Sequence, residues 1–430
     1  MRRLALDLYR HALEAVEGDQ VVMRALRSDR GTDPVAVISI GKAACAMASG
    51  ALRHLGDRVE SGLIITRHGY VSGFHDDRLT VLTAGHPVPD AASLAAGKAL
   101  LKQIDELPFD REILFLLSGG TSSLVEVLPP TVDLDTLART NDWLLASGLD
   151  IHDMNRVRSA LSEIKAGRLI PRLAGRPTRA LLMSDVPGDE PASIGSGLLI
   201  PPREAPGDLP EVPGWLAELV RHRSPAPAGA EIGQPDVAIR VVARNRDALE
   251  AAAGRAAQAG YRVTVHDQLL TGNPEAACSR ILAALGACAE AGADDFRPTV
   301  HLWGGEVTPS LPPVPGRGGR CQHLALMLAA RVSGRPGVVV LCAGTDGSDG
   351  PGGDAGALID GETLTRGRYE GEDPERCLRE ADSGRFLEAA GDLISTGPTG
   401  ANVMDVVIGL AGFTSPAGGI SLASGLEELM

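Results

Sequence analysis

The stretch VAVISIGKAACAMASGALRHL, residues 35–55, sets the pattern that decides the fold. Six apolar or small residues are followed by a glycine and then by a segment with helical periodicity. A short, continuous apolar run of this kind is typical of a strand that is buried on both faces of a parallel sheet. We therefore expect a strand–turn–helix unit here, with Gly41 and Lys42 at the turn.

A short apolar run followed by a polar, glycine-containing loop recurs four more times along the chain. Parallel strands interleaved with helices are expected from this repetition, which places the protein in the α/β class. The loops at the carboxyl ends of parallel strands line the ligand crevice, so the chemistry is expected in these loops. The four further runs are EILFLLSGG (112–120), RALLMSDVPGDE (179–190), TVHLWGGE (299–306) and GVVVLCAGTDGSDG (337–350).

The chain is long enough for two domains. It has 430 residues, of which 44% are hydrophobic, so each half can bury a core of its own. Proline, glycine and alanine replace any periodic pattern between residues 221 and 236, and a new apolar run, VAIRVVA, follows. These features predict an N-terminal domain over 1–228 and a C-terminal domain over 235–430.

The charge balance limits the partners. There are 41 Lys and Arg residues against 55 Asp and Glu residues, a net charge of -14 that repels nucleic acid and anionic lipid. Six widely spaced cysteines form no zinc-binding or redox motif, and we expect them to be reduced. With no apolar signal core or long apolar run, a cytoplasmic protein without membrane or nucleic-acid partners is expected. The oligomeric state stays open, and a homodimer is one of the options.

Two basic or glycine-rich turns are candidate anion sites. Lys42 follows a strand and precedes a helix, a position suited to phosphate oxygens, although a Walker A loop is absent and an ordinary exposed lysine is the alternative. The turn GRGGR combines flexible glycines with the forked donors of Arg317 and Arg320, which match a carboxylate or a phosphoryl group.

The loop SGGTSS, residues 118–123, offers backbone N–H groups at Ser118, Gly119 and Gly120 for close approach of an anion. A tight strand-to-helix turn explains the same residues equally well. The segment HDMNRVRSALSEIKAGRL, residues 152–169, is interpreted as one helix. Its polar face is either simply solvated or lines the anion cleft with Lys165, with Arg156 at the edge.

Several carboxylates lie on loops after predicted strands. Oxygen ligands that are few and loop-borne suit an Mg²⁺ ion shared with substrate phosphates better than a closed protein cage. Local Asx turns are the competing explanation for any one of them. The candidate metal ligands are Asp185, Asp189, Glu306 and Asp346.

Nine short motifs in series resemble the class II glycerate kinases, whose C-terminal part is called the MOFRL domain. The resemblance covers nearly the whole chain, and its specificity comes from the order of the motifs rather than from any one of them. They are GKAACAMA, HPVPD, SGGTSS, NRVRSALSEIKAGRL, SDVPGDEPASIGSG, GGE, GRGGRCQ, GTDGSDGP and TGPTGANVMD.

The resemblance implies transfer of the γ-phosphoryl group of ATP to the 2-hydroxyl of D-glycerate. It further implies a cleft between a Rossmann-like N-terminal domain and a smaller α/β C-terminal domain, with Lys42 and Arg320 as the active-site cations. We expect Arg320, helped by Arg156 or Lys165, to fix the substrate carboxylate as well. The chain departs from the family at residues 321–323, where Cys-Gln-His replaces a usual Asn-Gln-Glu.

Three rival functions remain open at this point. A kinase of a related small hydroxy acid would follow from the departure at residues 321–323. A hydroxypyruvate reductase using NAD(P)H would need a G-x-G-x-x-G fingerprint, and the spacing of Gly41 and Gly50 does not supply it. A non-catalytic small-molecule sensor would keep the cleft without the chemistry, but no module to pass on a signal is evident.

Overall fold

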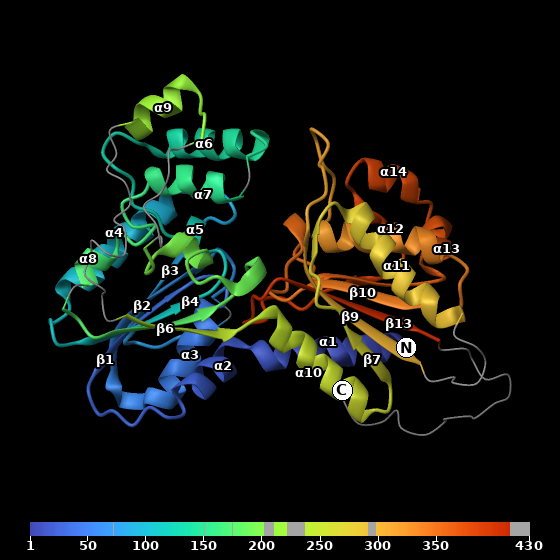
Figure 1. Cartoon of the computed structure of the whole chain (residues 1–430), viewed down its shortest axis with the longest axis horizontal. Helices are drawn as coiled ribbons and strands as arrows, with labels where there is room; N and C mark the ends of the chain where they lie inside the picture. Colours follow the sequence, from blue (N-terminus) through green and yellow to red (C-terminus); the bar gives the residue numbers. More distant parts are fainter. Residues whose placement is uncertain are drawn as a thin grey trace.

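Two α/β lobes lie side by side in the computed structural model (Figure 1). Each lobe has a central sheet with helices on both faces, and we call them the first and second lobes in chain order of their sheets. The predicted α/β class with two sheets is confirmed. The structure describes residues 1–71, 73–149, 151–173, 175–201, 210–221, 237–290 and 298–412.

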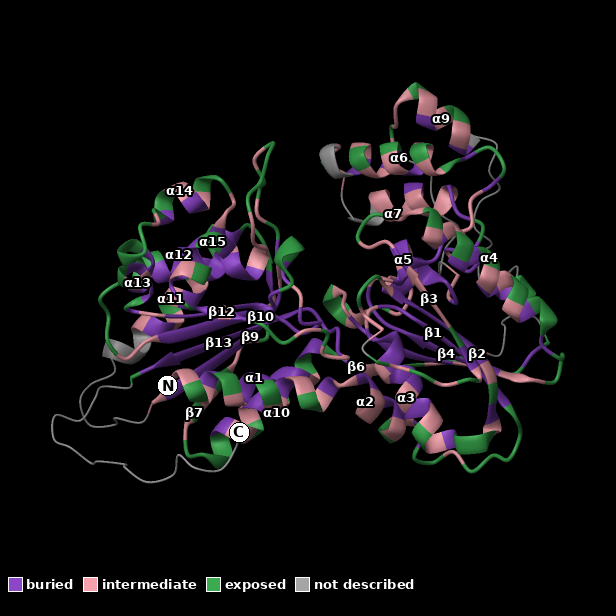
Figure 2. Ribbon diagram, turned by 180° about the vertical axis from the view of Figure 1, so that it is seen from behind, coloured by how far each residue is buried: buried purple, intermediate pink, exposed green. Residues whose placement is uncertain are grey.

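The sheet of the first lobe has six parallel strands in the order β3-β2-β1-β4-β5-β6. Its central strands are buried along their whole length, which explains their continuous apolar sequences (Figure 2). The order reverses between β1 and β4, so the loops after these two strands flank a crevice. The strands are β1 (Val35–Ile40), β2 (Val59–Arg67), β3 (Leu79–Ala84), β4 (Glu112–Leu117), β5 (Thr178–Met183) and β6 (Val237–Ala243).

Helices cover both faces of this sheet. One face packs against α2 and α3, and the other against α4. A separate apolar cluster joins α6, α7 and α9 above the sheet (Figure 1). The helices of this lobe are α2 (Gly18–Leu26), α3 (Ala44–Leu55), α4 (Ala91–Glu106), α5 (Thr121–Leu124), α6 (Leu134–Ala146), α7 (Ile151–Ala160), α8 (Ile170–Leu173) and α9 (Gly214–Arg221), with short 3₁₀ turns at Gly56–Arg58, Pro187–Asp189 and Ile194–Gly197.

The sheet of the second lobe is mixed. Its order is β12-β11-β10-β13-β9-β7, with β8 also paired to β9. The sequence predicted β9 and β10 as parallel strands, and for β10 this is wrong, because both of its pairings are antiparallel. Burial on both faces gave β10 the apolar run that parallel strands usually have. The strands are β7 (Arg262–Val265), β8 (Leu270–Gly272), β9 (Thr299–Val307), β10 (Val339–Gly344), β11 (Gly356–Asp360), β12 (Leu393–Ile394) and β13 (Asp405–Ala411).

Helices α1 and α10 cover one face of the second sheet, and α11 and α12 cover the other (Figure 1). The apolar face of α1 lies against this sheet, and its Leu8, Ala12 and Val16 are all fully buried. The helices of this lobe are α1 (Arg2–Val16), α10 (Asn245–Gln258), α11 (Pro274–Glu290), α12 (Arg320–Val332), α13 (Thr363–Tyr369), α14 (Pro374–Arg379) and α15 (Ser383–Ala389), with a 3₁₀ turn at Gly350–Gly352.

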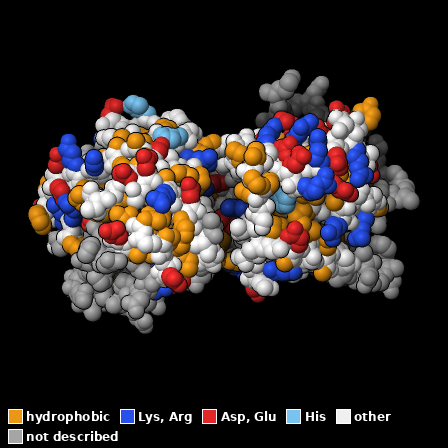
Figure 3. Space-filling view, turned by 90° about the horizontal axis from the view of Figure 1, so that it is seen from above, with side chains coloured by type: hydrophobic (Ala, Val, Ile, Leu, Met, Phe, Trp, Pro, Cys, Tyr) orange, Lys and Arg blue, Asp and Glu red, His pale blue; other side chains and the backbone are white. Residues whose placement is uncertain are grey.

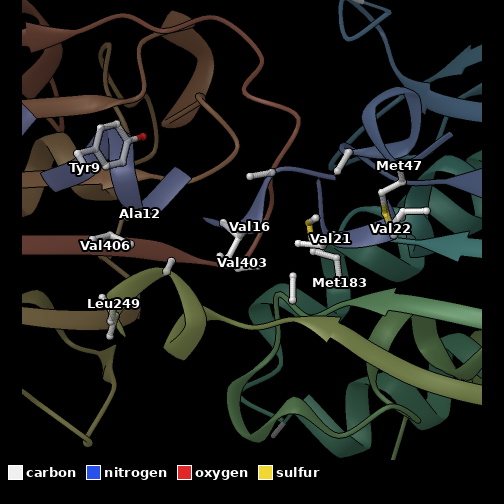
Figure 4. Packing of buried hydrophobic residues seen from close by; sticks show 14 of the residues in the cluster. Tyr9, Ala12, Val16, Val21, Val22, Met47, Met183, Leu249, Val403 and Val406 are labelled. Atoms are coloured by element: carbon white, nitrogen blue, oxygen red, sulfur yellow. The ribbon is translucent and has the colours of Figure 1, made fainter. Parts of the chain in front are cut away.

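The lobes and the predicted domains differ at two places. The predicted boundary falls in residues 222–236, outside the described residues, but β6, just beyond it, is the edge strand of the first sheet. Helix α1, at the start of the chain, packs on the second sheet. The chain therefore crosses between lobes twice, from α1 to α2 and from β6 to α10. One apolar cluster runs through both crossings, and Figure 4 shows it passing from Tyr9 to Met183.

The predicted helix over 152–169 is only partly correct. Helix α7 ends at Ala160, and a series of turns follows in which Ala166 and Gly167 have φ values of 52° and 78°. The Ser162 hydroxyl accepts hydrogen bonds from the backbone N–H groups of Ile164 and Lys165 at 3.3 and 3.2 Å. Such local side-chain bonds compete with helical hydrogen bonding, which explains why the helix stops.

Among the described helices, none is both long enough and apolar enough to cross a membrane.

Candidate active site

The candidate site lies between the lobes, at the carboxyl ends of the parallel strands of the first sheet. In the space-filling view the molecule narrows between the lobes, and Lys, Arg, Asp and Glu side chains lie in the hollow there (Figure 3). The first lobe contributes the loops after β1, β4 and β5, and the second lobe contributes β9, the start of α12 and the loop after β10. This is the crevice that the reversal of strand order predicts.

Two loops of the first lobe interlock at the crevice. The Lys42 N–H donates to the Gly119 carbonyl at 2.9 Å, and the Ala43 N–H donates to the buried Ser118 hydroxyl at 3.0 Å. Gly41 is required, because a Cβ there would lie 2.1 Å from the Ser118 Oγ and its φ is 129°. Ser118 therefore ties the two loops together with its hydroxyl, and Gly119 and Gly120 form the rim of the crevice.

Lys42 is paired across the cleft. Its Nζ donates to Asp346 Oδ2, in the loop after β10, at 2.6 Å. Burial disfavours the charged ammonium, but the carboxylate of Asp346 more than offsets this, so the pKa of Lys42 lies above its ordinary value. The predicted phosphate-site lysine and one of the predicted metal ligands thus form an ion pair between the lobes.

Arg320 is the first residue of α12, and two carboxylates hold its guanidinium. Its Nε and Nη2 donate to Asp405 at 2.6 and 3.0 Å, and Nη2 lies 2.6 Å from Glu306 Oε1. Burial and the neighbouring Asp405 raise the pKa of Glu306 to about 8, although Arg320 opposes the shift. The predicted catalytic arginine is therefore fixed in an acidic setting.

Three groups of the second lobe fix this arrangement. Met404, next to Asp405, has a φ of 68°, and the Thr345 hydroxyl holds its carbonyl at 2.7 Å. Asn245, at the start of α10, donates to the Asp405 carbonyl at 3.0 Å. Asp349 accepts the N–H groups of Cys321 and Gln322, the second and third residues of α12, at 3.0 and 2.8 Å. These hydrogen bonds fix the backbone beside Asp405 and the first turn of α12, which carries Arg320.

Asp185 lies at the end of β5, directly against the glycine loop. A Cβ on Gly119 would be 1.8 Å from Asp185 Oδ2 and 2.0 Å from the Asn402 Nδ2, so only glycine fits between them. Burial raises the pKa of Asp185, and the charges of Lys42 and Arg320 both oppose the shift. The two predicted cations, one from each lobe, therefore act on the same carboxylate.

Other predicted site residues have partners of their own. The Lys165 ammonium is buried and paired with Glu126, Arg156 is paired with Asp153, and Arg317 is bound to Glu388 and Asp354. Asp189 faces Arg244 at 3.7 Å. Each of these four residues has an ionic partner outside the cluster around Asp185, and their predicted roles remain predictions.

Four residues of this region were not predicted from the sequence: Arg67, His86, Asn402 and Asp405. Arg67 ends β2, and the His86 ring packs over Gly120, where an added Cβ would lie 3.2 Å from the His86 Nε2. Burial, with the charges of Lys42 and Arg67, lowers the pKa of His86 to about 3. Asn402 and Asp405 belong to the motif TGPTGANVMD, whose polar residues were a usable signal.

The donor set fits a shared metal ion better than a closed metal site. Among the described residues, no group of three His, Cys, Asp or Glu side chains gathers to hold a metal. Burial raises the pKa values of Asp185 and Glu306, and neighbouring carboxylates add to both shifts. One or two carboxylates beside substrate phosphates are the usual way in which proteins hold Mg²⁺.

Comparison with known proteins identifies the family. A profile described as "Domain of unknown function (DUF4147)" matches residues 4–212, and one described as "MOFRL family" matches residues 299–405. A D-glycerate 2-kinase of Thermotoga maritima is 33% identical over 423 residues, covering 95% of this chain and 98% of that protein. The chain belongs to the glycerate kinase family. It is a kinase of that family, and the resemblance inferred from the nine motifs is confirmed.

A solved structure and a further relative extend the comparison within this glycerate kinase family. The crystal structure of a glycerate kinase from Thermotoga maritima superposes with a TM-score of 0.80 at 32% identity, covering 95% of this chain and 99% of that one. A relative from Agrobacterium vitis, 37% identical over 86% of this chain and 85% of that protein, carries the provisional name hydroxypyruvate reductase.

Proposed function

We propose that this chain transfers the γ-phosphoryl group of ATP to the 2-hydroxyl of D-glycerate, giving 2-phospho-D-glycerate. The names of its relatives support glycerate as the acceptor and position 2 as the site of transfer. The observation that carries the proposal is that the cleft between the lobes holds one cation from each side, with Lys42 of the first lobe paired to Asp346 of the second lobe, and Arg320 of the second lobe paired to Glu306 and Asp405. Two partly buried cations on either side of one cleft suit a transferring phosphoryl group.

The residues act mainly by positioning and by charge. Phosphoryl transfer passes through a loose transition state with charge on the equatorial oxygens, so little covalent chemistry is required of the protein. Lys42 would approach the phosphoryl oxygens from the first lobe, and Arg320 from the second. The N–H groups of Gly119 and Gly120 lie at the rim of the same crevice, where they could donate to a phosphate. Asp346 would release Lys42 as the anion enters.

The acid groups explain why a divalent cation fits this site. Lys42 and Arg320 face four carboxylates, those of Asp185, Glu306, Asp346 and Asp405. Each of these two cations already has a carboxylate partner, so the pair offers no net positive charge to a bare triphosphate. When bound, Mg²⁺ would neutralise part of the phosphate charge. Asp185 and Glu306 are the residues that would hold it, and Lys42 and Arg320 are left to contact the phosphoryl group.

The identity of the reaction product tests the proposed function. Purified protein is incubated with ATP, Mg²⁺ and ¹³C-labelled D-glycerate, and the product is read by ¹³C and ³¹P NMR. The proposal expects phosphorus coupling at carbon 2. Coupling at carbon 3 would keep the family and exclude the proposed position, and unchanged glycerate with a hydroxy acid that does react would redirect the proposal to that acid. The Lys42→Ala variant serves as the inactive control.

The reductase alternative has a separate test, because a relative bears that name. Hydroxypyruvate and NADH are mixed with the protein and followed at 340 nm without a coupling enzyme. If the protein is a kinase and not a reductase, the absorbance at 340 nm stays constant. Sustained oxidation of NADH would refute the proposed function.

A further inference from the structure

A third cation lies at the same edge of the first lobe, and the proposed phosphoryl transfer does not use it. Arg67 is the last residue of β2, next to the strand that leads into Lys42. A turn follows in which the Tyr70 N–H donates to the Arg67 carbonyl at 3.0 Å, with Gly69 at a φ of 82°. This turn places the Tyr70 ring against the guanidinium, 5.2 Å from ring centroid to Cζ.

The charge of Arg67 has no carboxylate partner among the described residues. Its Nη1 donates only to hydroxyls, to Ser348 at 3.2 Å and to Tyr70 at 3.4 Å. Ser348 belongs to the same loop of the second lobe as Asp346, so this loop contacts both cations of the first lobe. The Asp346 carboxylate of this loop neutralises Lys42, whereas Arg67 donates only to the neutral hydroxyl of Ser348 in this loop.

The surroundings of Arg67 are cationic as well. Its charge and that of Lys42 both act on the His86 ring, which stays neutral beside them. Neither the Nε nor the Nη2 of Arg67 has a hydrogen-bond acceptor in the described part of the chain. A half-buried guanidinium with a free donor edge, braced by an aromatic ring, is suited to a two-oxygen anion.

The two anions of the proposed reaction differ in what they bring with them. A triphosphate arrives with Mg²⁺ and tolerates carboxylates such as Glu306 and Asp405 around Arg320. A glycerate carboxylate brings no metal, and beside Arg320 it would compete with Asp405, which already binds the guanidinium through two hydrogen bonds. Of the three cations that the described residues bring to the cleft, only Arg67 offers positive charge without a carboxylate beside it.

We propose that Arg67 binds the carboxylate of the acceptor and thereby selects hydroxy acids over neutral polyols. The inference rests on the proposed function and replaces the expectation that Arg320 fixes the substrate carboxylate. Tyr70 and Ser348 are the positioning residues for Arg67, since they hold one edge of the guanidinium and leave the other free.

The test compares wild type with Arg67→Gln and Arg67→Lys. Steady-state kinetics are measured for D-glycerate, for ATP and for D-glyceramide, a neutral analogue of the acceptor. We expect the KM for D-glycerate to rise about 10- to 100-fold in Arg67→Gln, the effect of losing a charge-assisted pair. Arg67→Lys should recover part of it, the KM for ATP should change less than about 2-fold, and the preference for D-glycerate over D-glyceramide should disappear.

Arg172→Gln is the matched control, because Arg172 is an exposed arginine on α8 of the same lobe that pairs with Asp105. It should keep the wild-type constants. A rise in the KM for ATP, or an unchanged preference for the acid in Arg67→Gln, overturns the inference and leaves the proposed function standing. Wild type that neither binds D-glycerate by calorimetry nor phosphorylates it overturns the proposed function and the inference with it.

Discussion

The two sides of the cleft hold opposite electrostatic environments. On the first lobe, burial and the charges of Lys42 and Arg67 lower the pKa of His86 to about 3. On the second lobe, burial and Asp405 raise the pKa of Glu306 to about 8. Each group is driven to its neutral form by burial and by neighbours of its own charge sign. Between these two pKa values, His86 is therefore deprotonated and Glu306 is protonated.

This difference explains how a cleft with more acidic than basic side chains can bind two anions. The first lobe can accept an anion directly, because part of its positive charge is uncompensated. The second lobe holds its arginine between two carboxylates and can accept an anion only together with a metal ion. We infer from this contrast that the acceptor carboxylate binds at Arg67 on the first lobe, whereas Arg320 on the second lobe contacts only the metal-bound phosphoryl group, and each prediction below changes one side.

The largest effect is expected from Arg320→Ala. Within the described part of the chain, Arg320 is the only basic residue paired with both Glu306 and Asp405, and its loss leaves these acids without their partner. We expect kcat for phosphoryl transfer to fall by about 10² or more, the usual result of removing one oriented charge from a transition state. Coupled detection of ADP measures it. Arg331→Ala, at the exposed far end of the same helix, should keep wild-type turnover.

A smaller effect is expected from Asp405→Asn. The amide keeps one acceptor for Arg320 but removes the charge that orients the guanidinium. We expect kcat to fall about 10-fold, in the range found for groups that support functional residues. The KM for D-glycerate should hardly move if that acid binds on the first lobe. A large rise in that KM, with kcat maintained, would place the acceptor beside Arg320 and reverse the comparison.

The same variant should change the titration of Glu306. Asp405 is the second cause of its raised pKa, after burial, so removing that charge should lower the pKa from about 8. It should stay above the ordinary value because burial remains. NMR of ¹³C-labelled glutamate carboxyl groups follows it. A Glu306 that titrates near its ordinary value in wild type would show that the second side is not acid-rich.

Much of the fold could be predicted from the sequence, because apolar runs and glycines report directly on buried strands and turns. The strand ends carrying Lys42, Gly119 and Asp185 were located in this way. The mixed second sheet could not be, since full burial gives antiparallel and parallel strands the same apolar appearance. The placement of β6 and α1 depends on tertiary packing across the lobes, which local periodicity does not encode.

Local sequence patterns predicted the candidate site less completely than they predicted the fold. Lys42 and Asp346 are separated by 304 positions, and nothing local says that they pair. Lys165 and Arg156 were predicted from the polar face of an expected helix, whereas a buried Glu126 and a nearby Asp153 pair with them in the structure. Charge patterns in a sequence identify cations, and only the fold shows which cations lack a partner. Arg67 was overlooked for this reason.

The smallest effect concerns stability at low pH. The pKa of His86 is about 3 in the folded chain and near 6.5 when unfolded, so the unfolded chain binds more protons between these values. The stability that His86 contributes is therefore present above about pH 6.5 and is lost as the pH falls toward 3. His86→Gln has no such group, and its melting temperature should fall less between pH 7 and pH 5, by about 2 °C. Arg67→Gln should reduce the loss in the same direction, because Arg67 helps to lower this pKa. Differential scanning fluorimetry at the two pH values measures both variants, and identical pH slopes for wild type and His86→Gln would mean that the first side of the cleft lacks the positive excess on which the comparison depends.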